Sequence, residues 1–214
     1  LVAISIISTA ACYAQTSSTI SIGTIDSVHS NVLKENRKIW VYLPGATNVP
    51  NATRLTSQKY PVVYLLDGDA NFCSVAGMIQ QLSQLNPGTI VCPEMIVVGI
   101  RNTDRLRDLS PTYISNKELG SDSMGVLTTT GGGEAFMKFL EKELIPHVDS
   151  LYPTSTYRMF IGHSLGGLTV MNALIHHANL FNSYVAIDPS MWWDSQKLLK
   201  EAYDVLREKR FSDK

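Results

Sequence analysis

The sequence has no long hydrophobic run and no excess of charge of either sign. Its 214 residues carry 18 Lys and Arg against 19 Asp and Glu, and like charges do not cluster. This balance gives no electrostatic reason to expect nucleic acid or an anionic membrane as a partner. The sequence also shows no internal repeat and no low-complexity segment. Because the length suits one core rather than two, we predict a single globular domain that acts on a small molecule.

The longest uncharged apolar stretch, residues 1–14, is too short for a transmembrane segment, which needs about 20 apolar residues. It ends in Cys12-Tyr13-Ala14, with small residues where signal peptidase prefers them, and a polar segment begins at Gln15. We therefore predict a signal peptide over residues 1–14, a mature domain over residues 15–214, and export to the periplasm or the medium. Neither a Met nor a basic segment precedes Leu1, so we expect the sequence to lack its first residues.

Cysteine is scarce, with three in the chain. Cys12 could be the attachment site of a lipoprotein signal, but that motif normally has a larger apolar residue at the position of Thr9. We therefore favour the cleaved signal peptide. Cys73 and Cys92 could form a disulfide in an oxidising compartment or remain unpaired, and we predict free, buried thiols.

Strand and helix patterns alternate along the rest of the chain. β-branched and aromatic residues predict a hairpin of two strands over residues 18–27 and 38–43. Nearly continuous apolar runs, typical of strands buried on both faces, follow over 60–66, 95–100, 157–161 and 184–187. Helical spacing predicts helices over 74–85, 134–151, 165–178 and 201–209, with a long irregular segment over 101–133. The alternation predicts an α/β fold, with a largely parallel sheet and helices on both faces.

The motif Gly162-His163-Ser164-Leu165-Gly166 lies between the predicted strand 157–161 and the predicted helix 165–178. A nucleophile elbow needs this context, with small residues around the serine because the turn is very tight. Such a turn raises the Ser164 hydroxyl at the carboxyl edge of the sheet and directs the next N–H into the site. We predict Ser164 as a nucleophile and the Leu165 N–H as an oxyanion donor. The alternative is a Gly-rich turn whose serine only caps the helix.

A second oxyanion donor is expected from the loop that follows the predicted strand 60–66. Asp67-Gly68-Asp69 leaves that strand in the right place, and we assign the role to the backbone N–H of Asp69. Two fixed donors stabilise a tetrahedral oxyanion and therefore raise the rate. The alternative is an ordinary Asp-Gly turn.

Five segments occur in order and with sensible spacing over residues 34–193. They are Tyr64-Leu65-Leu66-Asp67-Gly68, Arg107-Asp108-Leu109-Ser110-Pro111, Glu143-Leu144-Ile145-Pro146, Gly162-His163-Ser164-Leu165-Gly166-Gly167 and Asp188-Pro189-Ser190-Met191-Trp192-Trp193. Together they resemble the esterase D type of esterases within the α/β-hydrolase superfamily, a group that includes periplasmic esterases that open trilactone siderophores. The resemblance implies an α/β-hydrolase fold.

The resemblance also implies that Arg107, Trp192 and Trp193 line the substrate entrance. An arginine there could hold an anionic group by paired hydrogen bonds. Arg107 could instead pair with Asp108 or another loop charge, and the tryptophans could pack in the core.

A catalytic histidine is missing from this pattern. Serine is a weak nucleophile at neutral pH and needs a base, which α/β-hydrolases supply after the serine and an acid in chain order. The two histidines that follow Ser164 are at least 12 residues along the same helix, which is about 18 Å away. Of the other three, His163 lies in the elbow itself and His29 lies in the hairpin. His147 lies in a helix that returns to the opposite edge of the sheet. We predict that all five are structural or exposed: His29, His147, His163, His176 and His177.

We therefore expect the fold to continue past Lys214, with further strand units that carry the acid and the base. Asp188, at the tip of the predicted strand 184–187, reaches the correct edge of the sheet and could orient a distant histidine. The resemblance offers an alternative, because the family usually has a small, substrate-lining residue at this position.

The sequence as a whole predicts a serine-dependent carboxylic ester hydrolase that forms an acyl-enzyme on Ser164. The expected partner is a small-molecule ester, and no metal or organic cofactor is expected. The alternatives are an acyltransferase on the same fold, or a non-catalytic binding protein on a hydrolase scaffold if the chain truly ends at Lys214.

Overall fold

The computed structural model describes residues 21–45, 58–84, 91–115 and 129–208. The predicted signal peptide over 1–14 lies outside the described residues, as do the first residues of the predicted strand 18–27. Part of the segment predicted as irregular, residues 116–128, also lies outside them. None of the helices in the described ranges combines the length and the hydropathy that a membrane span requires.

A six-stranded sheet forms the centre of the domain, in the order β1-β2-β4-β3-β5-β6. An antiparallel hairpin, β1 (Thr24–Ser30) and β2 (Glu35–Tyr42), joins the sheet through an antiparallel pairing of β2 with β4 (Ile96–Ile100). The strands β3 (Tyr60–Leu65), β4, β5 (Thr154–His163) and β6 (Ser183–Ile187) are parallel to one another. The predicted hairpin and the largely parallel sheet are therefore confirmed.

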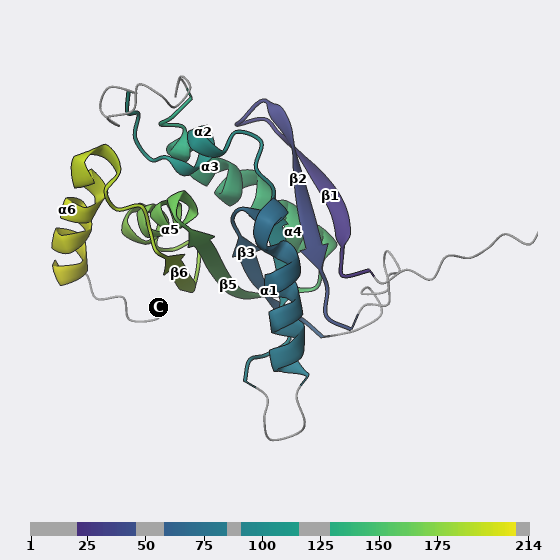
Figure 1. The fold of residues 1–214 in the computed structure, drawn as a ribbon. Helices are drawn as coiled ribbons and strands as arrows, with labels where there is room; N and C mark the ends of the chain where they lie inside the picture. The colour runs from purple at the N-terminus through teal and green to yellow at the C-terminus, as the bar shows by residue number, and fades with distance from the viewer. Residues whose placement is uncertain (1–20, 46–57, 85–90, 116–128, 209–214) are drawn as a thin grey trace, which may run out of the picture.

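Helices cover both faces of this sheet (Figure 1). On one face lies α1 (Gly68–Ser83). The other face carries a continuous helical run, α3 (Gly133–Phe139), η2 (Leu140–Leu144) and α4 (Ile145–Leu151), together with α5 (Leu165–His176). The short α2 (Arg105–Leu109) contacts α3 and α5, and α6 (Trp193–Glu208) packs against α5.

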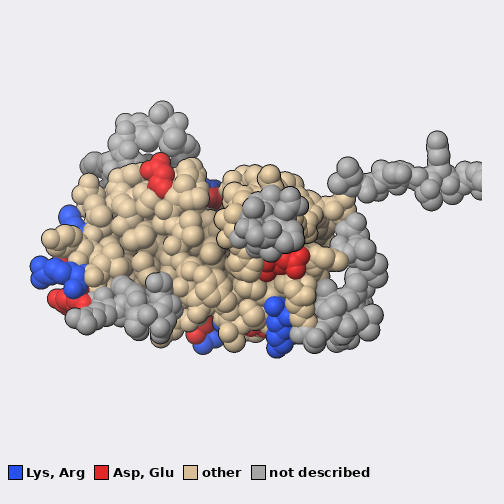
Figure 2. Space-filling model, turned by 90° about the horizontal axis from the view of Figure 1, so that it is seen from below, with Lys and Arg blue, Asp and Glu red and all other residues tan. Residues whose placement is uncertain are grey.

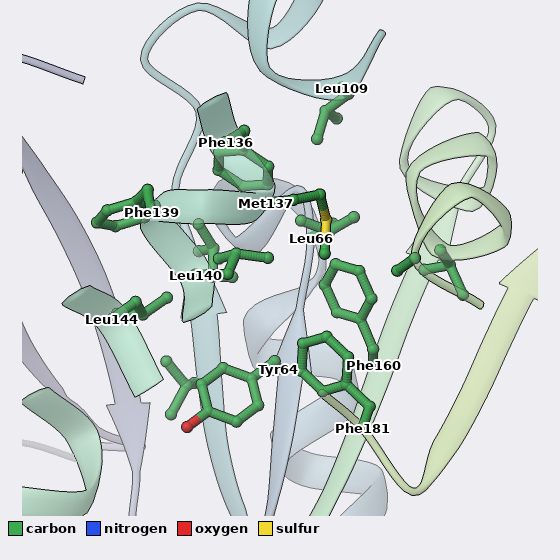
Figure 3. Packing of buried hydrophobic residues seen from close by; sticks show 14 of the residues in the cluster. Tyr64, Leu66, Leu109, Phe136, Met137, Phe139, Leu140, Leu144, Phe160 and Phe181 are labelled. Carbon is green, nitrogen blue, oxygen red and sulfur yellow. The ribbon is translucent and has the colours of Figure 1, made fainter. Parts of the chain in front are cut away.

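The alternation of side chains along β3 explains the two-sided core, since successive residues of a strand point to opposite faces. Val63 and Leu65 pack with the residues of α1. Tyr64, on the opposite face, is fully buried and lies close to Phe160 and Phe181, whose rings stack with centroids 4.5 Å apart (Figure 3). Both faces of the central strands are thus apolar, as their continuous hydrophobic runs predict.

Two helices begin earlier than the sequence pattern predicts. The predicted helix 74–85 starts at Gly68, because Asp67 adopts φ 52° and turns the chain from β3 directly into α1. The predicted helix 201–209 lies in α6, where residues 194–196 have left-handed backbone angles that kink the chain and the regular helix follows them. The segment predicted as irregular contains the short helix α2.

The predicted helix 134–151 is continuous, but η2 within it is a π-helix. Pro146 is the second residue of α4, which follows η2. A proline has no N–H to donate and its ring crowds the preceding turn, so a wider turn at this point relieves the clash without breaking the helix.

In the part of the chain that the structure describes, two of the strands predicted to be buried on both faces are not. β6 lies at the edge of the sheet, with Val185 and Ile187 36% and 49% exposed, and its neighbour β5 is only partly buried, with Tyr157 38% exposed. Both cysteines in the described ranges are free, as predicted, but neither is fully buried: Cys92 is half-buried and Cys73 is exposed. The reason is its position on α1, one residue beyond Phe72, which points into the core.

Charged side chains are scattered on the face that Figure 2 shows. Blue and red spots lie apart or in pairs of opposite sign, and most of the described surface in this view is neither. This distribution reflects the near balance of basic and acidic residues in the sequence.

Candidate active site

The Gly-x-Ser-x-Gly motif forms a sharp turn between β5 and α5. Ser164 joins the two elements with φ 57° and ψ −117°, a backbone conformation that non-glycine residues rarely adopt. A Cβ atom on Gly162 would lie 2.4 Å from the carbonyl carbon of Gly166. Gly167 is also restricted, because a Cβ there would lie 2.9 Å from the Cα of Pro189. The tight packing of the turn therefore requires the small residues of the motif.

Ser164 makes no side-chain capping hydrogen bond to α5, so the alternative of a helix-capping serine is wrong. Its Oγ instead lies 3.2 Å from the Oγ of Ser190. Its backbone N–H donates to the carbonyl of Ile187 at 3.1 Å, and its carbonyl accepts from the N–H of Ser190 at 3.0 Å. These bonds hold the turn against the segment that follows β6.

The loop after β3 lies beside this turn. The N–H of Leu66 donates to the carbonyl of Ile161 at 2.9 Å, because β3 and β5 are parallel neighbours whose carboxyl ends meet at one edge. On the helix that follows the turn, a Cβ atom on Gly166 would lie 3.3 Å from Oδ2 of Asp67. The two loops are therefore in contact across the edge of the sheet.

The two amides predicted as oxyanion donors lie at this edge. Leu165 is the first residue of α5, and Asp69 is the second residue of α1. The N–H groups in the first turn of a helix have no acceptor within that helix and are available to a ligand. The structure thus places both amides in the first turns of helices that begin side by side.

Sequence reasoning missed a charged cluster beside these helix starts. Asp67 is 6% exposed and accepts two hydrogen bonds from Arg105, from Nε to Oδ1 at 2.7 Å and from Nη2 to Oδ2 at 2.9 Å. Asn102 donates to Oδ1 of Asp67 at 2.7 Å and to Oδ1 of Asp69 at 3.1 Å. The hydrogen bonds with Asp67 raise the pKa of Arg105. The cluster therefore links the segment after β4 to the segment after β3.

A signal for this cluster is present in the sequence. Asp67 follows one buried strand, and Asn102 and Arg105 follow the next buried strand along the chain. Because the carboxyl ends of parallel strands meet at one edge, polar side chains at these positions can meet there.

Arg107, which the resemblance places at the substrate entrance, makes its paired hydrogen bonds to protein carboxylates. Its Nη1 and Nη2 donate to Glu35 at 3.1 Å and 2.6 Å, and its Nε donates to Asp108 at 2.8 Å. These bonds raise the pKa of Arg107, and the hydrogen bond from Arg107 is the main cause of the lowered pKa of Glu35. The arrangement matches the alternative interpretation, in which Arg107 pairs with nearby charges.

The two tryptophans have different environments. Trp193 is 3% exposed, and its Nε1 donates to the carbonyl of Thr112 at 3.1 Å. Trp192 is 57% exposed, and the two ring centroids are 5.8 Å apart. Trp193 thus has the core position of the alternative interpretation, while Trp192 presents an aromatic surface to solvent.

Trp193 also lines a cavity of about 280 Å³, together with Asn172 and His176 of α5. These two residues lie about two and three turns along α5 from Ser164. The cavity is therefore adjacent to the far half of α5 rather than to its start.

The histidines are bonded to other groups or exposed. His29 contacts Asn36 at 2.8 Å, His147 contacts Asp26 at 2.8 Å, His176 contacts Glu201 at 3.5 Å, and His177 contacts Glu134 at 3.1 Å. His163 is exposed at the end of β5. In the described ranges no histidine is hydrogen bonded to Ser164, which agrees with the predicted structural or exposed positions.

Asp188 directly follows β6 and is exposed, with φ 42°. In the part of the chain that the structure describes, no histidine is bonded to its carboxylate. The same described residues hold no group of three or more His, Cys, Asp or Glu that could bind a metal ion.

Comparison with known proteins relates this geometry to curated relatives. The ferri-bacillibactin esterase of Bacillus subtilis is 29% identical over 174 residues, which cover 78% of this chain and 58% of the relative. The siderophore enterobactin esterase of Emericella nidulans is 31% identical over 155 residues, which cover 65% of this chain and 49% of the relative. The chain thus spans about half the length of the curated relatives it matches.

Solved structures share the fold. An IroE-like serine hydrolase from Shewanella oneidensis superposes with a TM-score of 0.74 at 36% identity, covering 86% of this chain and 56% of that one. A siderophore hydrolase from Aspergillus nidulans gives a TM-score of 0.73 at 23% identity, covering 92% of this chain and 69% of that one. These superpositions confirm the predicted α/β-hydrolase fold. Residues 30–214 match the family model described as "Putative esterase", and the chain belongs to this esterase family.

Proposed function

We propose that this chain is a serine-dependent carboxylic ester hydrolase whose nucleophile is Ser164. The observation that carries the proposal is the backbone of Ser164, which is held at φ 57° and ψ −117° at the carboxyl edge of the sheet. Such strain persists only where the surrounding packing enforces it, and it is common at catalytic sites. Membership of the esterase family and 36% identity to a serine hydrolase support the same activity.

The proposed reaction has two steps. Ser164 Oγ attacks the ester carbonyl carbon, its proton passes to a base, and the negative charge on the carbonyl oxygen is stabilised by the N–H groups of Leu165 and Asp69. The intermediate collapses to acyl-Ser164 when the protonated base gives its proton to the departing alcohol. Water then attacks the acyl carbonyl in the same way and releases the carboxylic acid, which restores the Ser164 hydroxyl.

We infer that the ester is part of a siderophore. The support is the substrate class named for two curated relatives, a ferri-bacillibactin esterase and an enterobactin esterase. Trp192 provides an exposed aromatic ring on which a flat substrate group could stack. The apolar segment over residues 1–14 supports export of the enzyme.

The test is covalent labelling with a fluorophosphonate, which reacts with an activated serine. It uses the full-length gene product, because a serine needs a base for activation and no histidine in the described ranges is bonded to Ser164. We expect labelling of the natural chain and its loss in Ser164→Ala. Ser183→Ala is the matched control, because Ser183 lies on β6 and hydrogen bonds to Tyr157 rather than to the turn. Equal labelling of the natural chain and Ser164→Ala would refute the proposed nucleophile, and no labelling of either would favour the non-catalytic binding protein.

The substrate class needs a separate measurement. The full chain should release the monomer acid from enterobactin with a kcat/KM higher than that for p-nitrophenyl acetate. Hydrolysis of the small ester alone would leave the esterase proposal intact and refute the siderophore as substrate.

A further inference from the structure

We infer that Ser190 is a positioning residue that fixes the hydroxyl of Ser164 for attack. This inference rests on the proposed function, because it concerns the same nucleophile. In the described part of the chain, the side chain of Ser164 has one hydrogen-bond partner, the Oγ of Ser190 at 3.2 Å. The contact joins residues 26 positions apart, so it depends on the pairing of β5 with β6.

Ser190 itself is held in place on several sides. It is 4% exposed, its N–H donates to the carbonyl of Ser164 at 3.0 Å, and its carbonyl accepts from the N–H of Trp193 at 3.0 Å. Trp193 is in turn anchored by the bond from its Nε1 to Thr112. A hydroxyl on such a fixed backbone is preorganised, so it loses little freedom when it binds the nucleophile.

The hydrogen bond between the two hydroxyls can run in either direction, and the two directions have different consequences. If Ser164 donates, its proton is held by Ser190 and is not available to a base. If Ser190 donates, the proton of Ser164 is free for a base, and the Ser190 O–H stabilises the charge that develops on Oγ during attack. The second direction is the reactive one, and in it Ser190 keeps its own proton throughout.

The buried hydroxyl also restricts the rotamer of Ser164. A serine side chain has a small set of staggered rotamers, and a hydrogen bond to a fixed partner favours one of them. Removal of the Ser190 hydroxyl therefore frees Ser164 to populate rotamers that do not point at the substrate. The backbone bonds of Ser190 do not depend on its side chain, so Ser190→Ala removes the hydroxyl contact alone.

The test compares Ser190→Ala, Ser190→Thr and the control Ser183→Ala by fluorophosphonate inactivation of the full chain. For Ser190→Ala we expect kinact to fall about fivefold, the size of one lost hydrogen bond. KI should stay within about twofold, because the hydroxyl contacts the nucleophile rather than the probe. Ser190→Thr keeps a hydroxyl and should restore most of kinact, and Ser183→Ala should match the natural chain.

The outcomes separate this inference from the proposed function. Labelling of the natural chain with an unchanged kinact in Ser190→Ala would overturn the role of Ser190 and leave Ser164 as the nucleophile. A changed KI with unchanged kinact would also overturn it, since it would indicate contact with the substrate. If Ser190→Ala has a lower melting temperature than Ser183→Ala, the kinact of Ser190→Thr decides: recovery supports the hydroxyl's role, and no recovery refutes it.

Discussion

Arg37 and Asp108 form a buried ion pair that joins the hairpin to α2. Arg37 Nη1 donates to Asp108 Oδ2 at 2.6 Å, and the two side chains are 1% and 2% exposed. The guanidinium of Arg37 also lies 5.6 Å and 5.7 Å from the ring centroids of Phe136 and Phe139. A charge in this position is compensated by its partners, and the removal of one partner leaves the other buried and incompletely paired.

The first prediction concerns this pair. Arg37→Met should lower the free energy of unfolding by about 3 kcal/mol, because among the described residues the buried carboxylate of Asp108 then keeps only its bond from Arg107. Lys142→Met is the control, since its ion pair with Glu141 is largely exposed and should contribute less than about 1 kcal/mol. Urea denaturation of the full chain measures both, and equal losses would contradict the prediction.

The second prediction concerns acid stability and Glu35. The pKa of Glu35 is lowered below its usual value of 4.5, and the main cause is its hydrogen bonding with Arg107. A carboxyl with a lower pKa in the folded state stabilises the fold above the unfolded pKa, and this contribution is lost as the pH falls through the folded pKa. We expect the unfolding free energy of the natural chain to fall more steeply below pH 4.5 than that of Glu35→Gln. Chemical denaturation at several pH values measures this. The same dependence of the unfolding free energy on pH in both proteins would refute this assignment.

The sequence predicts the elements that depend on local pattern. The continuous apolar runs of β3 and β4 identify buried strands, because both faces of these strands are covered by helices. The strained turn at Ser164 follows from the glycines beside it, since the motif, its strand and its helix are adjacent in the chain. β6 has the same apolar pattern as a buried strand, yet it lies at the edge of the sheet. Neighbours in space, rather than its own residues, determine its exposure.

The contacts between distant segments depend on which strands pair, and the local patterns that place polar residues at strand ends do not specify this pairing. Asp67 meets Arg105 because β3 pairs with β4, and Ser164 meets Ser190 because β5 pairs with β6. Arg107 and Arg105 show a further limit of motif reasoning. They are two residues apart on α2, which turns the second side chain about 200° from the first. Arg105 therefore faces Asp67 and Arg107 faces Glu35. The orientation of α2 determines which arginine faces which carboxylate.

The third prediction concerns the pair of Asp67 and Arg105. Asp67→Asn keeps the size of the side chain but removes the charge that binds the guanidinium in two places. We expect a moderate loss of stability, since Arg105 is about a third exposed, and a larger relative loss in fluorophosphonate inactivation rate. The reason is the position of Asp69, whose predicted oxyanion amide follows Asp67 in the first turn of α1. Arg158→Gln, which removes a partly exposed bond to Asp149 away from the turn, is the control and should leave the rate unchanged.

A rate in Asp67→Asn equal to that of the natural chain would contradict the third prediction. Loss of the rate in Arg158→Gln as well would show that the assay reports general destabilisation rather than the geometry of the site.

The last prediction concerns the packing of the turn itself. In Gly162→Ala the new Cβ would lie 2.4 Å from backbone atoms of Gly166, a clash that only a shift of the turn can relieve. Overpacking of this kind costs about 1–3 kcal/mol, and the shift moves Ser164 relative to the predicted oxyanion donors. We therefore expect both a lower free energy of unfolding and a loss of fluorophosphonate labelling.

Gly77→Ala is the matched control for this change. Gly77 lies within α1, and a Cβ added there meets nothing within 4 Å. Because alanine favours the helix by about 0.5–1 kcal/mol over glycine, this variant should be slightly more stable and label like the natural chain. Full labelling of Gly162→Ala would show that the turn can accommodate a side chain without moving Ser164, and the geometric basis of the proposed nucleophile would then fail.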